Sequence, residues 1–168
     1  MTTEQQAELA PDRIPVSVMM ECKHRQSGRW SFPAWNAIGV VVAGARATGE
    51  PLKRSQVRDE DGVQQFLWTG LVLELFKDGC ESYWYNLVAE KPSLFVVCRH
   101  DEDGGGLMPV LVSANPDEAG AHEEGDDTVF DVAMPPEVYR WLERFVVEHY
   151  RPSERKKRER QNWTEDSK

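Results

Sequence analysis

The sequence predicts a β-rich α+β fold. We expect about seven mostly antiparallel strands, arranged as a small barrel or a two-layer sandwich and closed by one C-terminal amphipathic helix. Several segments alternate apolar and polar residues, as half-buried strands do. Short turns separate these segments, which favours antiparallel pairing. A hydrophobic content of 40% with six Trp residues is typical of a folded globular protein.

The first strands follow from local patterns. Residues 14–22 alternate in period two, and Pro15 fits such a strand only at its start or on a sheet edge. A turn at 24–28 leads to a second extended segment, 30–42, which Pro33 kinks or bulges. Residues 44–62 are rich in Gly, Pro and acidic side chains, so we expect a surface loop there.

The centre of the chain predicts five further strands, at residues 66–76, 81–89, 94–100, 107–113 and 128–133. Gly70 marks a possible bulge in the first of them. Asp78-Gly79 predicts a hairpin turn between the first two, because both residues tolerate positive φ. Asn115, as a cap before Pro116, predicts one helical turn over 115–119, followed by an acidic loop over 122–127.

The most regular pattern lies near the C-terminus and predicts a helix over about 136–150. Its apolar stripe has helical spacing and consists of Val138, Trp141, Leu142, Phe145, Val146 and His149. Pro136 suits the first turn, and Pro152 prevents the helix from continuing. We expect the stripe to cover the core of the domain; the alternative is a helix that enters a partner's groove.

These elements predict a flexible lead (1–12), a single globular domain (13–151) and a disordered basic tail (152–168). Three widely spaced Cys residues indicate no disulfide framework. No apolar run approaches the roughly 20 residues needed to cross a bilayer, and the N-terminus does not resemble a signal peptide. We therefore expect a cytoplasmic protein without membrane contact.

The charge is unevenly distributed. The net charge is −9, yet residues 151–168 carry seven basic and four acidic side chains. An acidic body repels phosphates, so we do not expect it to bind nucleic acid. The candidate interaction residues are the basic side chains of the tail, which could contact nucleic acid or an acidic partner or remain solvated: Arg155, Lys156, Lys157, Arg158 and Arg160.

No catalytic, cofactor or metal motif is present in the sequence, so we predict no catalytic residue, cofactor or metal. The two Cys-x-His steps, 22–24 and 98–100, could form a zinc site only if their strands were neighbours in register. Otherwise Cys22 and Cys98 are buried cysteines beside exposed histidines.

Cys80 is followed by Glu81, which would raise the pKa of a thiol. The aromatic run 83–85 could stack bases, but a core or dimer role fits its acidic flanks better.

Several segments resemble the bacterial DUF3305 family: IPVSVMMECK, RWSFPAW, the W-x-G-x-x-L-E-L-F step at 68–76, YWYNL, PSLFVVCR and MPPEVYRWLERFVVEHYRP. The resemblance covers about residues 14–160. It implies a domain of unknown function, encoded near molybdenum-dependent formate dehydrogenases. Some members carry the label of a molybdopterin-guanine dinucleotide synthesis protein, but this chain lacks the glycine-rich nucleotide-binding loop which that activity needs.

We therefore expect a non-enzymatic accessory or protein-binding module, with enzymatic activity left open. Its partner would be a molybdenum-dependent redox enzyme such as formate dehydrogenase, or its maturation machinery. One alternative is a small-molecule or cofactor carrier with a pocket between barrel and helix, lined by Trp30, Trp35 or Trp84. The other alternative is weak nucleic-acid binding through the basic tail.

Overall fold

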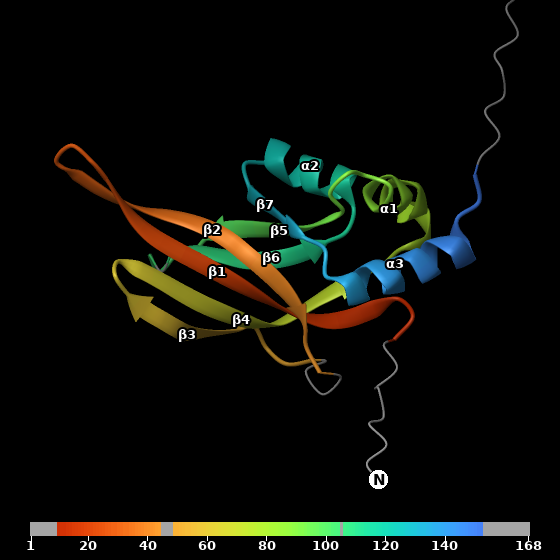
Figure 1. Cartoon of the computed structure of the whole chain (residues 1–168), viewed down its shortest axis with the longest axis horizontal. Coiled ribbons are helices and arrows are strands. Elements are labelled where there is room, and N and C mark those ends of the chain that lie inside the picture. The colour runs from red at the N-terminus through yellow and green to blue at the C-terminus, as the bar shows by residue number, and fades with distance from the viewer. Residues whose placement is uncertain (1–9, 45–48, 105, 153–168) are drawn as a thin grey trace, which may run out of the picture.

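A computed structural model describes residues 10–44, 49–104 and 106–152. Within this part of the chain there are seven strands and three α-helices (Figure 1). In chain order they are β1 (Arg13–Ser27), β2 (Trp30–Val42), β3 (Lys53–Glu60), β4 (Val63–Glu74), α1 (Cys80–Leu87), β5 (Ser93–His100), β6 (Leu107–Ser113), α2 (Pro116–Glu124), β7 (Thr128–Ala133) and α3 (Pro136–His149).

The strands form two antiparallel sheets. One has the order β2-β1-β4-β3 and the other β6-β5-β7. The sheets meet where β4 lies beside β6 and β2 lies beside β7. No hydrogen-bonded ladder among the described strands closes them into one barrel. Of the two predicted architectures, the structure therefore supports a sandwich-like arrangement.

The strand predicted at 14–22 is confirmed, but β1 continues to Ser27, so the turn predicted at 24–28 is wrong for its first four residues. Ile14, Val16, Val18 and Met20 alternate along it and are fully buried. Pro15 lies near the start of the strand, where β2 is not yet paired with it. The predicted bulge at Gly70 is confirmed, because Thr69 and Gly70 of β4 lie opposite a single β1 residue. A Cβ at Gly70 would lie 2.4 Å from the carbonyl oxygen of Pro51.

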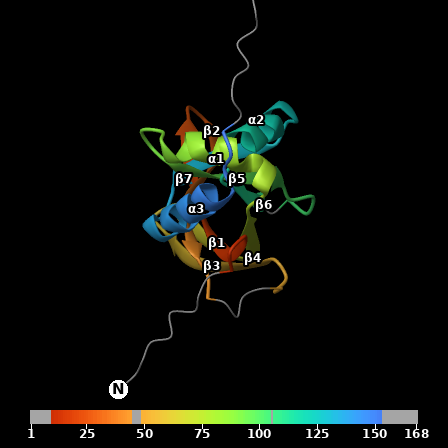
Figure 2. The same ribbon diagram turned by 90° about the vertical axis from the view of Figure 1, so that its right-hand side faces the viewer.

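All three helices lie at one end of the sheets (Figures 1 and 2). The predicted stripe of α3 is confirmed: Trp141 and Phe145 are buried, and His149 at its end is partly buried. The Trp141 indole N–H donates to the carbonyl of Ala10 at 2.8 Å. α3 also packs against α1. The final helix is therefore part of the folded body.

The predicted strand at 81–89 is wrong, because this segment contains α1. The predicted Asp78-Gly79 hairpin is also wrong, since Lys77–Gly79 forms a 3-10 turn that leads into the helix. Cys80, Tyr83 and Leu87 have helical spacing and are buried. The rings of Tyr83 and Phe145 meet edge to face at 6.3 Å between centroids. Packing against α3 thus overrides the β preference of the aromatic run.

The predicted loop over 44–62 is wrong for its second half, which contains β3. β3 pairs with β4 through a turn at Asp61-Gly62, where both residues have positive φ, 53° and 75°. An Asp-Gly hairpin is therefore present, but at 61–62 and not at 78–79. Every side chain of β3 is exposed, so the strand has no apolar alternation by which to recognise it.

The chain has more helix than predicted. The side chain of Asn115 caps α2 as expected, with its Oδ1 accepting from the N–H groups of Asp117 at 2.9 Å and Glu118 at 3.3 Å. However, α2 continues to Glu124, so the predicted acidic loop over 122–127 starts within the helix. The described residues therefore contain three helices, α1, α2 and α3, whereas the sequence predicted only the one that became α3.

Candidate functional site: an exposed arm and an open groove

The hairpin formed by the end of β1 and the start of β2 extends away from the helices (Figure 1). We call residues 23–33 the arm; all eleven are exposed. The two-residue turn consists of Gly28 and Arg29, and Gly28 adopts a φ of 61°. Glycine accommodates this conformation at the first position of such a turn without a steric penalty.

The strand register places charged and aromatic side chains on one face of the arm. Arg25 pairs with Phe32, Ser27 with Trp30, and Lys23 with Ala34. Directly opposed residues share a face, as do residues i and i+2. This face, which we call the basic-aromatic face, therefore carries two cationic and two aromatic side chains. Trp30 is 79% exposed and Phe32 46% exposed.

An ion pair marks the base of this face. Lys23 Nζ lies 3.1 Å from Glu21 Oε1, and Gln65 Nε2 donates to Glu21 Oε2 at 2.8 Å. The amide of Gln65, followed by Lys23, holds the pKa of the Glu21 carboxyl below its ordinary value. A shallow hollow of about 220 Å³ lies here, lined in part by Lys23, Arg25 and Ala34. The site therefore has a fixed polar base and an exposed tip.

A larger, open groove of about 630 Å³ lies between the second sheet and α3. Its lining comes from residues 91–93, residues 131–134 and three residues of α3: Pro136, Tyr139 and Arg140. Tyr139 donates from its hydroxyl to the carbonyl of Leu87 at 3.3 Å, which fixes one wall. The size is within the range of small-molecule sites. The groove is in the expected region, but Trp30, Trp35 and Trp84 do not line it.

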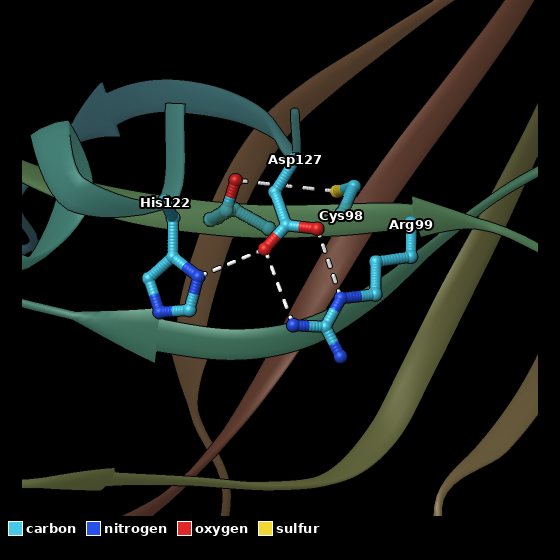
Figure 3. Close-up of polar contacts among 5 residues, drawn as sticks. Cys98, Arg99, His122 and Asp127 are labelled. Atoms are coloured by element: carbon cyan, nitrogen blue, oxygen red, sulfur yellow. Dashed lines mark hydrogen bonds and ion pairs between the residues drawn. The ribbon is translucent and has the colours of Figure 1, made fainter. Parts of the chain in front are cut away.

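A polar cluster lies where α2 meets β5 (Figure 3). The Asp127 carboxylate accepts from Arg99 Nε at 2.9 Å and Nη2 at 3.2 Å, and lies 2.8 Å from His122 Nδ1. The hydrogen bond from Arg99, followed by that from His122, lowers the pKa of Asp127 to about 2. The cluster fastens the last turn of α2 to the sheet. The pair of His122 and Asp127 resembles a base and its orienting carboxylate.

The cysteines do not supply a nucleophile. Cys98 is fully buried, and burial raises the pKa of its thiol to about 12. Its Sγ lies 4.0 Å from the carbonyl oxygen of Val96. Burial, followed by the charge of Asp78, also raises the pKa of Cys80. A thiol with a raised pKa has little thiolate at neutral pH and is a weak nucleophile.

The two Cys-x-His steps do not meet. Cys22 and His24 belong to β1 in the first sheet, whereas Cys98 and His100 belong to β5 in the second, so the strands are not neighbours in register. Both cysteines are buried and both histidines are exposed. No group of three or more potential metal-ligating side chains occurs among the described residues.

The comparisons with known proteins give one result. The model of the family described as "Protein of unknown function (DUF3305)" matches residues 15–160 of this chain. The chain belongs to the DUF3305 family. Neither the curated proteins nor the solved structures contain a match to it. In the part of this DUF3305 chain that the structure describes, no helix has the length and apolarity to span a membrane.

The interaction residues predicted from this DUF3305 sequence lie outside the described residues. Arg155, Lys156, Lys157, Arg158 and Arg160 belong to the segment 153–168. The arm was not predicted as a site, although the sequence holds a signal for it. Between Glu21 and Glu50 there are no acidic residues, whereas Lys23, Arg25, Arg29 and Arg46 are basic. In a chain with net charge −9, such a stretch marks a local positive surface.

Proposed function

We propose that this protein is a non-enzymatic protein-binding module that contacts its partner through the arm. The observation that carries the proposal is the exposure of Trp30 and Phe32 beside Arg25 on one face of a projecting hairpin. Tryptophan and arginine are enriched among the residues that dominate binding energy at protein interfaces. An exposed indole has a hydrophobic surface that a partner can remove from water.

The chemistry of the other clusters supports a binding role. His122 and Asp127 lie at a hydrogen-bonding distance, but their position between α2 and β5 serves to connect these elements. The buried thiols have raised pKa values. Neither arrangement offers an activated nucleophile, so binding accounts for the exposed features of the protein better than catalysis does.

The partner that we propose is a molybdenum-dependent redox enzyme, such as formate dehydrogenase, or a protein that matures it. This part of the proposal comes from the family resemblance, and the protein would act there as an accessory or assembly factor. A module without its own catalytic centre fits such a role because it needs only to recognise and hold another protein.

Affinity purification from the native host tests the proposal. The tagged full chain should recover a molybdenum-dependent redox enzyme or its maturation proteins, and the double variant Trp30→Ser/Phe32→Ser should lose them. The matched control is Val147→Ser, because Val147 is 76% exposed on α3, away from the arm. Recovery of no such protein, or equal recovery with the arm variant, would contradict the proposal.

The groove favours a second candidate function, a small-molecule or cofactor carrier. It combines an apolar wall with the cationic side chains of Lys91 and Arg140. Mass spectrometry of protein purified under native conditions should then show a bound molecule that the variant Tyr139→Ala retains less well. A spectrum of ligand-free protein would argue against this function.

Nucleic-acid binding through Arg155 to Arg160 stays a prediction from the sequence, since these residues lie outside the described part of the chain. Deleting residues 152–168 should abolish any salt-sensitive retention on DNA or RNA. Retention that persists without the tail would remove this alternative.

A further inference from the structure

We infer that the basic-aromatic face of the arm binds a carboxylate-rich surface of a partner protein. This inference rests on the proposed function and names the chemistry of the partner. It is based on three observations: the common face of Lys23, Arg25, Trp30 and Phe32, the distribution of charge, and the position of an acidic turn at the base of the arm.

The arm has two guanidinium groups that no described acidic side chain neutralises. Arg25 and Arg29 form no ion pair with any described residue. By contrast, Arg58 and Arg99 lie close to acidic side chains, at 3.8 Å from Glu60 and 2.9 Å from Asp127. Within the described part of the chain, these two guanidinium groups are therefore open to pair with carboxylates of another molecule.

Charge and hydrophobic surface coincide on this face. The Cα of Arg25 lies opposite that of Phe32. Trp30 lies two residues before Phe32 on β2 and therefore on the same face. A partner that covers the two rings also removes water from the neighbouring guanidinium. An unpaired cation loses hydration at such a site, so a carboxylate on the partner is needed to compensate it.

The surroundings favour an acidic protein surface over a nucleic acid. The N–H of His24 donates to the carbonyl of Gly62 at 3.3 Å, so the β3–β4 turn lies at the base of the arm. This turn follows Asp59 and Glu60 and contains Asp61. A long polyanion laid along the arm would meet these carboxylates. A compact acidic patch can instead contact the outer half of the arm and avoid them.

Site-specific photocrosslinking in the native host tests the inference with the full-length chain. A p-benzoylphenylalanine residue replaces Phe32 in one protein and Tyr85, an exposed side chain of α1, in the control. Position 32 should crosslink to protein segments with an excess of Asp and Glu. Arg25→Glu/Arg29→Glu should reduce the crosslinked product on the order of tenfold or more, because like charges would then oppose each other. Arg25→Lys/Arg29→Lys should retain most of it.

The outcomes separate the inference from the proposed function. Crosslinks from position 32 to nucleic acid, to a second copy of this chain or to segments without excess carboxylates would overturn the inference, as would a product insensitive to charge reversal. If a partner protein co-purifies but crosslinks only from position 85, the inference fails, and of the proposed function only protein binding remains, without the arm as its site. If neither position crosslinks to protein and nothing co-purifies, both fail.

Discussion

At the scale of single residues, the buried side chain of Asn86 connects three segments of the chain through hydrogen bonds. Its Nδ2 donates to the carbonyls of Ser93 and Ala114, each at 2.8 Å, and its Oδ1 accepts from the Ser93 N–H at 3.0 Å. The side chain is 4% exposed. One amide thus connects α1 to the start of β5 and to the residue after β6.

Asn86→Ala should destabilise the protein by about 1–3 kcal/mol, because the change leaves one buried and two partly buried backbone groups without their side-chain partner. Urea unfolding measures the effect. The matched control is Asn36→Ala, since Asn36 is exposed and should change the free energy of unfolding by less than about 0.5 kcal/mol. Equal effects of the two substitutions would show that the buried hydrogen bonds do not stabilise the fold.

Asp127 predicts a specific pH dependence. Arg99 and His122 lower its pKa from 3.8 to about 2, so the folded protein binds this proton less readily than the unfolded chain. A carboxyl of this kind stabilises the fold above its unfolded pKa, and the contribution disappears as the pH falls from about 4 through about 2. At pH 5, Asp127→Asn should therefore lower the urea midpoint.

The difference between wild type and Asp127→Asn should shrink as the pH falls from 4 to 2, which urea titrations at half-unit steps would show. Asp131→Asn is a suitable control, because Asp131 is exposed and has no ion pair among the described residues. A difference that stays constant down to pH 2 would contradict the assignment of this carboxylate.

At the scale of secondary-structure elements, α3 is the best test of the packing. Phe145 is 4% exposed and contacts the rings of Tyr83 on α1 and of His149 one turn further along the helix. Phe145→Ala should cost about 3–5 kcal/mol in the free energy of unfolding, the range for a buried aromatic side chain. Val147→Ala, on the exposed face of the same helix, should stay within about 0.5 kcal/mol. Similar losses would mean that the stripe does not face the core.

The predictability of the elements follows from how each is stabilised. β1 and α3 bury one side of a regular pattern, so periodicity predicts both. In α1 the positions 80, 83 and 87 fit a helix, yet the aromatic run 83–85 also fits a strand. Only the contact of Tyr83 with Phe145, 62 positions away in the chain, decides between them. Local sequence does not contain that information.

β3 illustrates a different difficulty. Its backbone pairs with β4, but all its side chains are exposed, so hydrophobicity does not mark it. The only local signal is Asp61-Gly62. The candidate site on the arm is hard to predict for a related reason, because positive charge stands out in a sequence where it is contiguous, as it is from Arg155 to Arg160. On the arm the cationic side chains occupy alternate positions of β1 and the aromatic side chains alternate positions of β2, and the register brings the two kinds together.

At the scale of the whole molecule, the arm is separate from the parts that stabilise the fold. The buried core includes residues of β1 before the arm and of β2 after it, whereas positions 23–33 are all exposed. Trp30→Ser/Phe32→Ser should therefore change the free energy of unfolding by less than about 0.5 kcal/mol while it abolishes partner binding. Thermal unfolding beside the affinity purification measures both. A large loss of stability would show that the two rings serve the fold.

The hydrogen bond between Trp141 and Ala10 has a consequence for biosynthesis. The bond joins residues 131 positions apart, near the two ends of the described chain. During translation the Ala10 carbonyl has no indole to accept from until the chain up to Trp141 has left the ribosome. Before that moment, Leu142 and Phe145 are also absent, and the apolar ends of the sheets stay uncovered. A nascent chain of this protein therefore depends on α3 to complete its core, and chains truncated before residue 136 should be targets for chaperones and proteases.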